Sequence, residues 1–182
     1  TLDPDSAGDS FGFWVAGAGD VNHDGHDDVI VGAPTDEQNG LSAGAAFVIS
    51  GANGAVLRKL LGASNTLFGF SVAGGRDSDG DGVPDFVVGA RRDALTGHDA
   101  GSVRVVSGAS GLALYTAYGS MGDQLGFSVA FAGDLNRDGR ADVVAGAPFA
   151  SPAISFAGSA RVLLGGCPAP ITYCVAKVNS LG

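Results

Sequence analysis

The chain has 182 residues, of which 31 are glycine and 45% are hydrophobic, so it is long enough to bury a core and its backbone turns often. Its formal net charge of −9 disfavours nucleic acid and anionic membrane surfaces as partners. No apolar run approaches the roughly 18 residues that a membrane span needs, so we expect no membrane insertion. The chain opens at Thr1 without a signal peptide, and we expect a mature or trimmed fragment.

Two cysteines, Cys167 and Cys174, lie near the C-terminal end. Their spacing is not that of a CxxC motif and there is no second pair, which disfavours a zinc site. Three interpretations stay open. The cysteines are small buried side chains, or they form a disulfide with each other, or Cys174 pairs with a cysteine beyond Gly182.

A repeat of 57 residues runs through the chain. Four separate groups of residues keep this spacing across three copies, which is the signature of a repeat architecture. The groups are Gly12, Gly69 and Gly126; Asp20, Asp77 and Asp134; the segments 32–34, 89–91 and 146–148; and the segments 43–44, 100–101 and 157–158.

Each copy contains four short apolar runs separated by Gly, Asp, Asn and Ser. In copy one the runs cover residues 11–18, 28–33, 44–50 and 55–61, and copies two and three repeat them at the same spacing. Short runs rich in Val, Ile and Phe between turn residues predict β-strands, and no segment sustains a helical period. The fourth strand of copy three is predicted over residues 171–174.

Four strands repeated at about 50 residues predict an all-β protein made of β-propeller blades. We expect three four-stranded antiparallel blades, over residues 11–67, 68–124 and 125–176, as part of a larger or oligomer-completed propeller. Residues 1–10 are expected to lead in from an upstream segment, and residues 177–182 to lead toward a further region. A β-sandwich of unrelated strands would not explain the fixed period.

An acidic loop lies between the first and second strands of every copy, over residues 20–28, 77–85 and 134–142. We number its positions from 1 to 9. Positions 1, 3, 5 and 9 always carry a side-chain oxygen, and position 6 is always glycine. The predicted ligands of a metal ion are these side chains and the position-7 carbonyl: Asp20, Asn22, Asp24, His26 and Asp28; Asp77, Asp79, Asp81, Val83 and Asp85; and Asp134, Asn136, Asp138, Arg140 and Asp142.

This spacing favours Ca²⁺, which takes six to eight hard oxygen ligands at roughly 2.3–2.6 Å. Alternating side chains in a tight loop converge on one point, and the glycine allows the sharp turn. An EF-hand would need Glu at position 12, where this chain has Val31, Val88 and Ala145. Mg²⁺ is a weaker alternative because it keeps several waters. The other alternative is an acidic turn whose side chains only cap backbone groups.

These residues resemble the FG-GAP repeats of the integrin α-subunit propeller. Phe-Gly stands at 11–12 and 68–69, and Gly-Ala-Pro at 32–34 and 146–148, with the acidic loop between them. The resemblance implies Ca²⁺ in all three loops and a secreted or cell-surface protein of adhesion and recognition. Copy three has Leu125 and copy two has Arg91 where the motifs have Phe and Pro, and the family closes its ring with seven blades rather than three. The regularity of the copies is similar to that of bacterial FG-GAP proteins.

We expect no enzymatic activity in this chain. Residues 8–12 match G-x-S-x-G, but that motif needs a strand–turn–helix context, whereas here a predicted strand follows. The three histidines, His23, His26 and His98, do not recur at the repeat spacing. The alternative function is a Ca²⁺-stiffened accessory domain of a larger secreted enzyme.

A protein or carbohydrate ligand is expected on the end of the blades opposite the acidic loops. There the connections between second and third strands, over residues 35–42, 92–99 and 149–156, differ most between copies, and variable loops on a rigid scaffold commonly form binding surfaces. Three blades cannot close a ring, because propellers close with about four to eight. We therefore expect either further blades or self-association.

Overall fold

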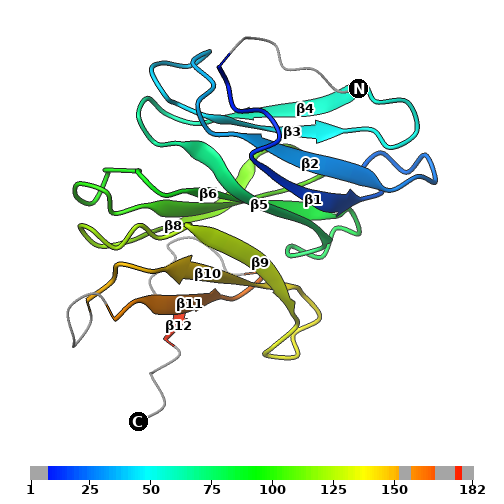
Figure 1. Ribbon diagram of the computed structural model, residues 1–182. Coiled ribbons are helices and arrows are strands. Elements are labelled where there is room, and N and C mark those ends of the chain that lie inside the picture. Colours follow the sequence, from blue (N-terminus) through cyan, green and yellow to red (C-terminus); the bar gives the residue numbers. More distant parts are fainter. Residues whose placement is uncertain (1–7, 152–156, 167–174, 178–182) are drawn as a thin grey trace.

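The computed structural model describes residues 8–151, 157–166 and 175–177, and in this part of the chain three antiparallel sheets form, as predicted (Figure 1). No helix in these ranges is long and apolar enough to cross a membrane. Blade 1 contains β1 (Trp14–Gly19), β2 (Asp28–Ala33), β3 (Ala45–Ile49) and β4 (Val56–Leu61). Blade 2 contains β5 (Phe68–Arg76), β6 (Asp85–Ala90), β7 (Ser102–Val106) and β8 (Ala113–Tyr118). Blade 3 contains β9 (Ser128–Gly133), β10 (Asp142–Ala147), β11 (Ser159–Leu163) and β12 (Val175–Lys177).

Each sheet is a simple meander in which consecutive strands pair. The acidic loops therefore lie at one end of the blades, and the connections from second to third strands lie at the other. In blade 3 the predicted fourth strand, 171–174, falls outside the described residues, and the strand that pairs with β11 there is β12, with Leu163 opposite Val175.

The three blades stack in chain order, with their first strands β1, β5 and β9 side by side (Figure 1). Residues alternate between the two faces of each sheet, as the pleat of a strand requires. On blade 1, Ile30 and Val48 face blade 2, whereas Val31 and Phe47 face away from it. Two continuous apolar layers result, one between blades 1 and 2 and the other between blades 2 and 3.

The glycines of the Phe-Gly and Gly-Ala motifs meet between neighbouring blades. Gly32 of blade 1 lies against the backbone of Gly69 in blade 2, and Gly89 lies against Gly126 in the same way. A Cβ on either Gly32 or Gly89 would collide with the facing carbonyl oxygen. The two motifs therefore recur together because each blade joint needs one glycine from each of them.

Each outer blade leaves part of one face open. Val15 on blade 1 is 63% exposed, whereas its counterpart Val72, which faces blade 1, is 1% exposed. Val29 is likewise 37% exposed where Phe86 is fully buried. On blade 3, Val144 is half-buried and Ala160 is exposed, whereas the residues at the same repeat positions of blade 2, Val87 and Val103, are buried. The predicted open faces are thus present in the described part of the chain.

The open face of blade 1 is partly covered by the chain itself. The ring of Phe11 packs edge-on against Phe47 at 5.3 Å between centroids, and Lys59 Nζ lies 4.6 Å from the same ring. Lys59 also forms an ion pair of 3.0 Å with the buried carboxylate of Asp36. These contacts keep Phe47 buried, and the remaining open area centres on Val15, Val29 and Val56.

Candidate metal centre

The three acidic loops share one backbone conformation. The residue at position 4 is left-handed in each loop, with φ of 57° at His23, 87° at Gly80 and 63° at Arg137. The position-6 glycines Gly25, Gly82 and Gly139 all have φ of 86°. A side chain is strained in that conformation, which explains the glycine. The loops therefore form one structure three times over.

In the first loop the side chains at positions 1 and 3 both accept a hydrogen bond from the backbone N–H of position 5. The Asp24 N–H donates to Asp20 Oδ1 at 3.0 Å and to Asn22 Oδ1 at 3.1 Å, so these two oxygens converge on one point. Asn22 Nδ2 donates to Asp24 Oδ2 at 2.9 Å. The third loop repeats these three contacts through Asp134, Asn136 and Asp138.

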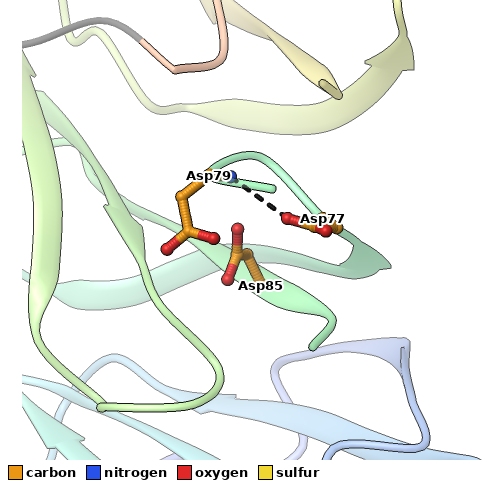
Figure 2. A group of neighbouring side chains, drawn as sticks. All are labelled: Asp77, Asp79 and Asp85. Carbon is orange, nitrogen blue, oxygen red and sulfur yellow. Dashed lines mark hydrogen bonds between the residues drawn. The ribbon is translucent and has the colours of Figure 1, made fainter. Parts of the chain in front are cut away.

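In the second loop three carboxylates gather. Oxygens of Asp77, Asp79 and Asp85 lie within 4.8 Å of one another, and Figure 2 shows the three groups together at the β5–β6 connection. The Asp79 N–H donates to Asp77 Oδ1 at 3.2 Å. Asp81 is outside this group, and its Oδ1 accepts a hydrogen bond from the Val83 N–H at 2.8 Å.

The position-9 carboxylates are buried, and each joins its loop to the turn after the third strand. Asp28 accepts hydrogen bonds from the N–H groups of Val21 at 2.9 Å and Gly51 at 3.0 Å. Asp85 and Asp142 make the equivalent pairs of bonds, to Ser78 and Gly108 and to Leu135 and Gly165. This is the capping role weighed above as an alternative. It does not compete with metal binding, because a carboxylate has about four lone-pair sites and two of them stay available.

The electrostatics of the second loop suit a cation. The pKa of Asp85 is raised to about 6, chiefly by burial; the hydrogen bonds from Gly108 and Ser78 oppose the rise, and the negative charges of Asp79 and Asp77 add to it. Burial also raises the pKa of Asp79. In the first loop, by contrast, the hydrogen bond from Asn22 lowers the pKa of the exposed Asp24. Binding of a proton or a cation in the second loop would therefore relieve the repulsion between its carboxylates.

The side chain of Arg140 is a feature of the site that the sequence pattern did not indicate. Its backbone belongs to the third loop, but its guanidinium lies beside Gly80 of the second loop and acts on the charge of Asp79. The Ala141 N–H also donates to the Asp77 carbonyl at 2.9 Å, which ties the two loops together. The one sequence signal that could have drawn attention to this side chain is that position 7 varies between the copies: it is His26, Val83 or Arg140.

Comparison with known proteins assigns the repeat. Residues 11–49 and 125–163 match the FG-GAP repeat family. The chain thus contains FG-GAP repeats. Both matched segments run from the Phe-Gly or Leu-Gly turn to the third strand, so each includes an acidic loop.

Animal integrin α-subunits are similar to this chain. It is 47% identical to integrin alpha pat-2 of Caenorhabditis briggsae over 89 residues, which cover 44% of this chain and 7% of that protein. It is 36% identical to integrin alpha-6 of Homo sapiens over 89 residues, or 47% of this chain and 7% of the relative. Integrin alpha-E of Mus musculus is 36% identical over 96 residues, 47% of this chain and 8% of the relative. The chain thus matches less than a tenth of the length of each of these relatives.

The resemblance to integrin α-subunits is therefore confirmed, and the likeness to bacterial proteins stays a prediction. The metal ligands also stay predictions, including the carbonyls of His26, Val83 and Arg140. At residues 8–12 the structure has a turn followed by β1, so Ser10 lacks the strand–turn–helix context of a nucleophile elbow.

Proposed function

We propose that this chain is a calcium-binding, extracellular β-propeller module that binds or adheres to other molecules and has no catalytic role of its own. The similarity to integrin α-subunits supports an adhesion or binding module. The observation that carries the calcium proposal is the threefold recurrence of one loop, with three carboxylates within 4.8 Å in the second copy.

The residues fit a hard divalent cation. Ca²⁺ prefers carboxylate, amide and carbonyl oxygens, and each loop supplies four such side chains together with the position-7 carbonyl. Bound calcium would supply positive charge that offsets the repulsion between the carboxylates. The proposed ligands are positions 1, 3, 5, 7 and 9 of each loop: residues 20, 22, 24, 26 and 28; 77, 79, 81, 83 and 85; and 134, 136, 138, 140 and 142.

The position-9 residues give calcium a direct effect on stability. Asp28, Asp85 and Asp142 are the first residues of β2, β6 and β10, and each also holds the turn between the third and fourth strands of its blade. A cation that keeps these carboxylates charged and in place therefore stabilises the hairpin and the turn together.

The experiment is thermal unfolding in calcium and after chelation. We expect calcium to raise the melting temperature, since a site at about 100 times its Kd adds on the order of 2.7 kcal/mol. In a variant with Asp24, Asp81 and Asp138 replaced by Asn, the rise in melting temperature caused by calcium should be smaller. If the melting temperature is unchanged after elemental analysis has shown that the ions are gone, the calcium proposal fails.

We also propose that the open faces of blades 1 and 3 are covered in the native protein, either by further blades or by a second copy. Val15 and Val29 support this, because the same repeat positions in blade 2 are buried against blade 1. At micromolar concentration we expect these 182 residues to self-associate, and light scattering measures it. A stable monomer of 17.9 kDa would contradict self-association.

A further inference from the structure

Blade 2 departs from the repeat at Arg91, which stands where the other copies have Pro34 and Pro148. Its guanidinium carbon lies 4.5 Å from the ring centre of Phe70 and 6.0 Å from that of Phe127. Nη1 donates to Gln124 Oε1 at 2.9 Å, whereas the buried Nε has no hydrogen-bond partner. The side chain is therefore held in place, and its Nε–H donor remains without an acceptor.

The next residue, Arg92, lines a pocket of about 390 Å³ between the connecting segments of blades 1 and 2, at the end opposite the acidic loops. Such a volume lies within the range of small-ligand sites. Within the described ranges, the Arg92 side chain forms no hydrogen bond or ion pair. The full lining is Ser42, Ser64, Asn65, Arg92, Ala94, His98 and Asp99.

Arg92 brings a positive charge to this pocket, on a protein whose net charge is −9. Burial, and next the charge of Arg92, lower the pKa of Arg91, so the two guanidinium groups act on each other. One carboxylate belongs to the lining, that of Asp99, and it lies 3.5 Å from His98 Nδ1. Arg92 is therefore a cation of the lining with no acid partner in the described ranges, and an incoming anion would supply one.

The uncharged lining indicates what kind of anion fits. Ser42, Ser64 and Asn65 offer hydroxyl and amide groups, and Ala94 is the one apolar lining residue. Protein interfaces are commonly anchored by aromatic side chains in well-packed, desolvated pockets, and this lining offers only Ala94 as an apolar surface. The hydroxyl groups of a sugar, by contrast, match a lining of hydroxyls and amides.

We propose that this pocket binds the carboxylate-bearing residue of an acidic carbohydrate. Arg92 pairs with the carboxylate, and the serines and Asn65 hydrogen-bond to the sugar hydroxyls. The inference rests on the proposed binding function and names the ligand class of its surface.

The test compares methyl β-glucuronide with methyl β-glucoside, which differ in having a carboxylate in place of a hydroxymethyl group. Ligand-observed NMR on the full 182-residue chain in calcium should show binding of the glucuronide alone. Arg92→Gln should weaken it about tenfold, the loss expected for a charged hydrogen bond. Arg76→Gln, an exposed arginine at the opposite end, should leave it unchanged.

A double variant, Arg91→Pro with Arg92→Thr, introduces the pair found in copy one and should weaken binding at least as much as Arg92→Gln in a folded protein. The proposal is overturned by absence of glucuronide binding, by equal binding of the glucoside, or by full binding to Arg92→Gln. N-acetylglutamate that displaces the glucuronide with equal strength would point to a peptide ligand instead. Calcium-dependent melting of the same preparation distinguishes these failures from failure of the calcium proposal.

Discussion

The guanidinium group of Arg140 lies beside Gly80 of the neighbouring loop, where a Cβ would be 3.5 Å from Arg140 Nε. This neighbour is the one loop with a carboxylate at position 3: Asp79 stands where the others have Asn22 and Asn136. The positive charge lowers the pKa of Asp79 against the larger effect of burial. The additional carboxylate of the second loop thus lies near the positively charged side chain of an arginine from the third loop.

Removing this charge should strengthen calcium binding at one site. A unit charge about 8 Å from a divalent ion in a water-like dielectric opposes it by on the order of 1 kcal/mol, so Arg140→Gln should lower one Kd about fivefold. The backbone carbonyl at position 140 is unaffected. Calorimetric titration measures the effect, and Arg137→Gln, an exposed arginine of the same loop, serves as the control. A weaker site in Arg140→Gln would show that the arginine supports the loop instead.

The register of the first loop can be tested with two neighbouring acids. Asp24 stands at position 5 and contacts Asn22 and His26, whereas no acid stands at the positions of Asp27 in the other copies. Asp24→Ala should therefore cost one bound calcium per chain, and Asp27→Ala should cost none. Elemental analysis of dialysed protein counts the ions. Equal losses would mean that the ligand positions are wrongly assigned.

The stability of the calcium-free protein should depend on pH through Asp85. The pKa of this carboxyl rises from 3.8 to about 6 on folding. Between about pH 4 and 6 the folded protein retains a proton that the unfolded chain has lost, so the free energy of unfolding falls as pH rises through this window. Denaturant unfolding of wild type and Asp85→Asn at each pH measures it.

Two variants distinguish the contribution of Asp85 from that of other carboxylates. Asp85→Asn should lack the fall in stability between pH 4 and 6. Asp142→Asn removes the residue that makes the equivalent pair of hydrogen bonds in blade 3 but leaves Asp85 in place, and it should keep the fall. The same slope in wild type and Asp85→Asn would refute the assignment.

Truncation of equivalent valines should show which blade face is covered. Val72→Ala removes methyl groups buried between blades 1 and 2, and it should cost about 1–3 kcal/mol of unfolding free energy. Val15→Ala, at the open counterpart, should change the stability of a dilute monomer by no more than about 0.5 kcal/mol. A large cost at Val15 that grows with protein concentration would indicate that a second copy covers the face.

Local features of this protein followed from its sequence. The apolar runs predicted the strands of blades 1 and 2 to within a few residues, because alternation and turn residues act within a few positions of each other. The predicted first run begins at residue 11, but β1 begins at Trp14, where its pairing with β2 starts opposite Gly32. The glycine at position 6 predicted the loop conformation for the same local reason.

Contacts between blades depended on the tertiary structure. The sequence alone determined the repeat, the strands, the acidic loops and the resemblance to integrin α-subunits, because each is written within a single copy or in its spacing. The position of Arg140 at the second loop and of Arg91 on Phe70 and Phe127 was decided only by the stacking of the blades. The stacking depends on the angle by which each blade is rotated relative to the next blade, and the 57-residue period of the sequence does not determine this angle.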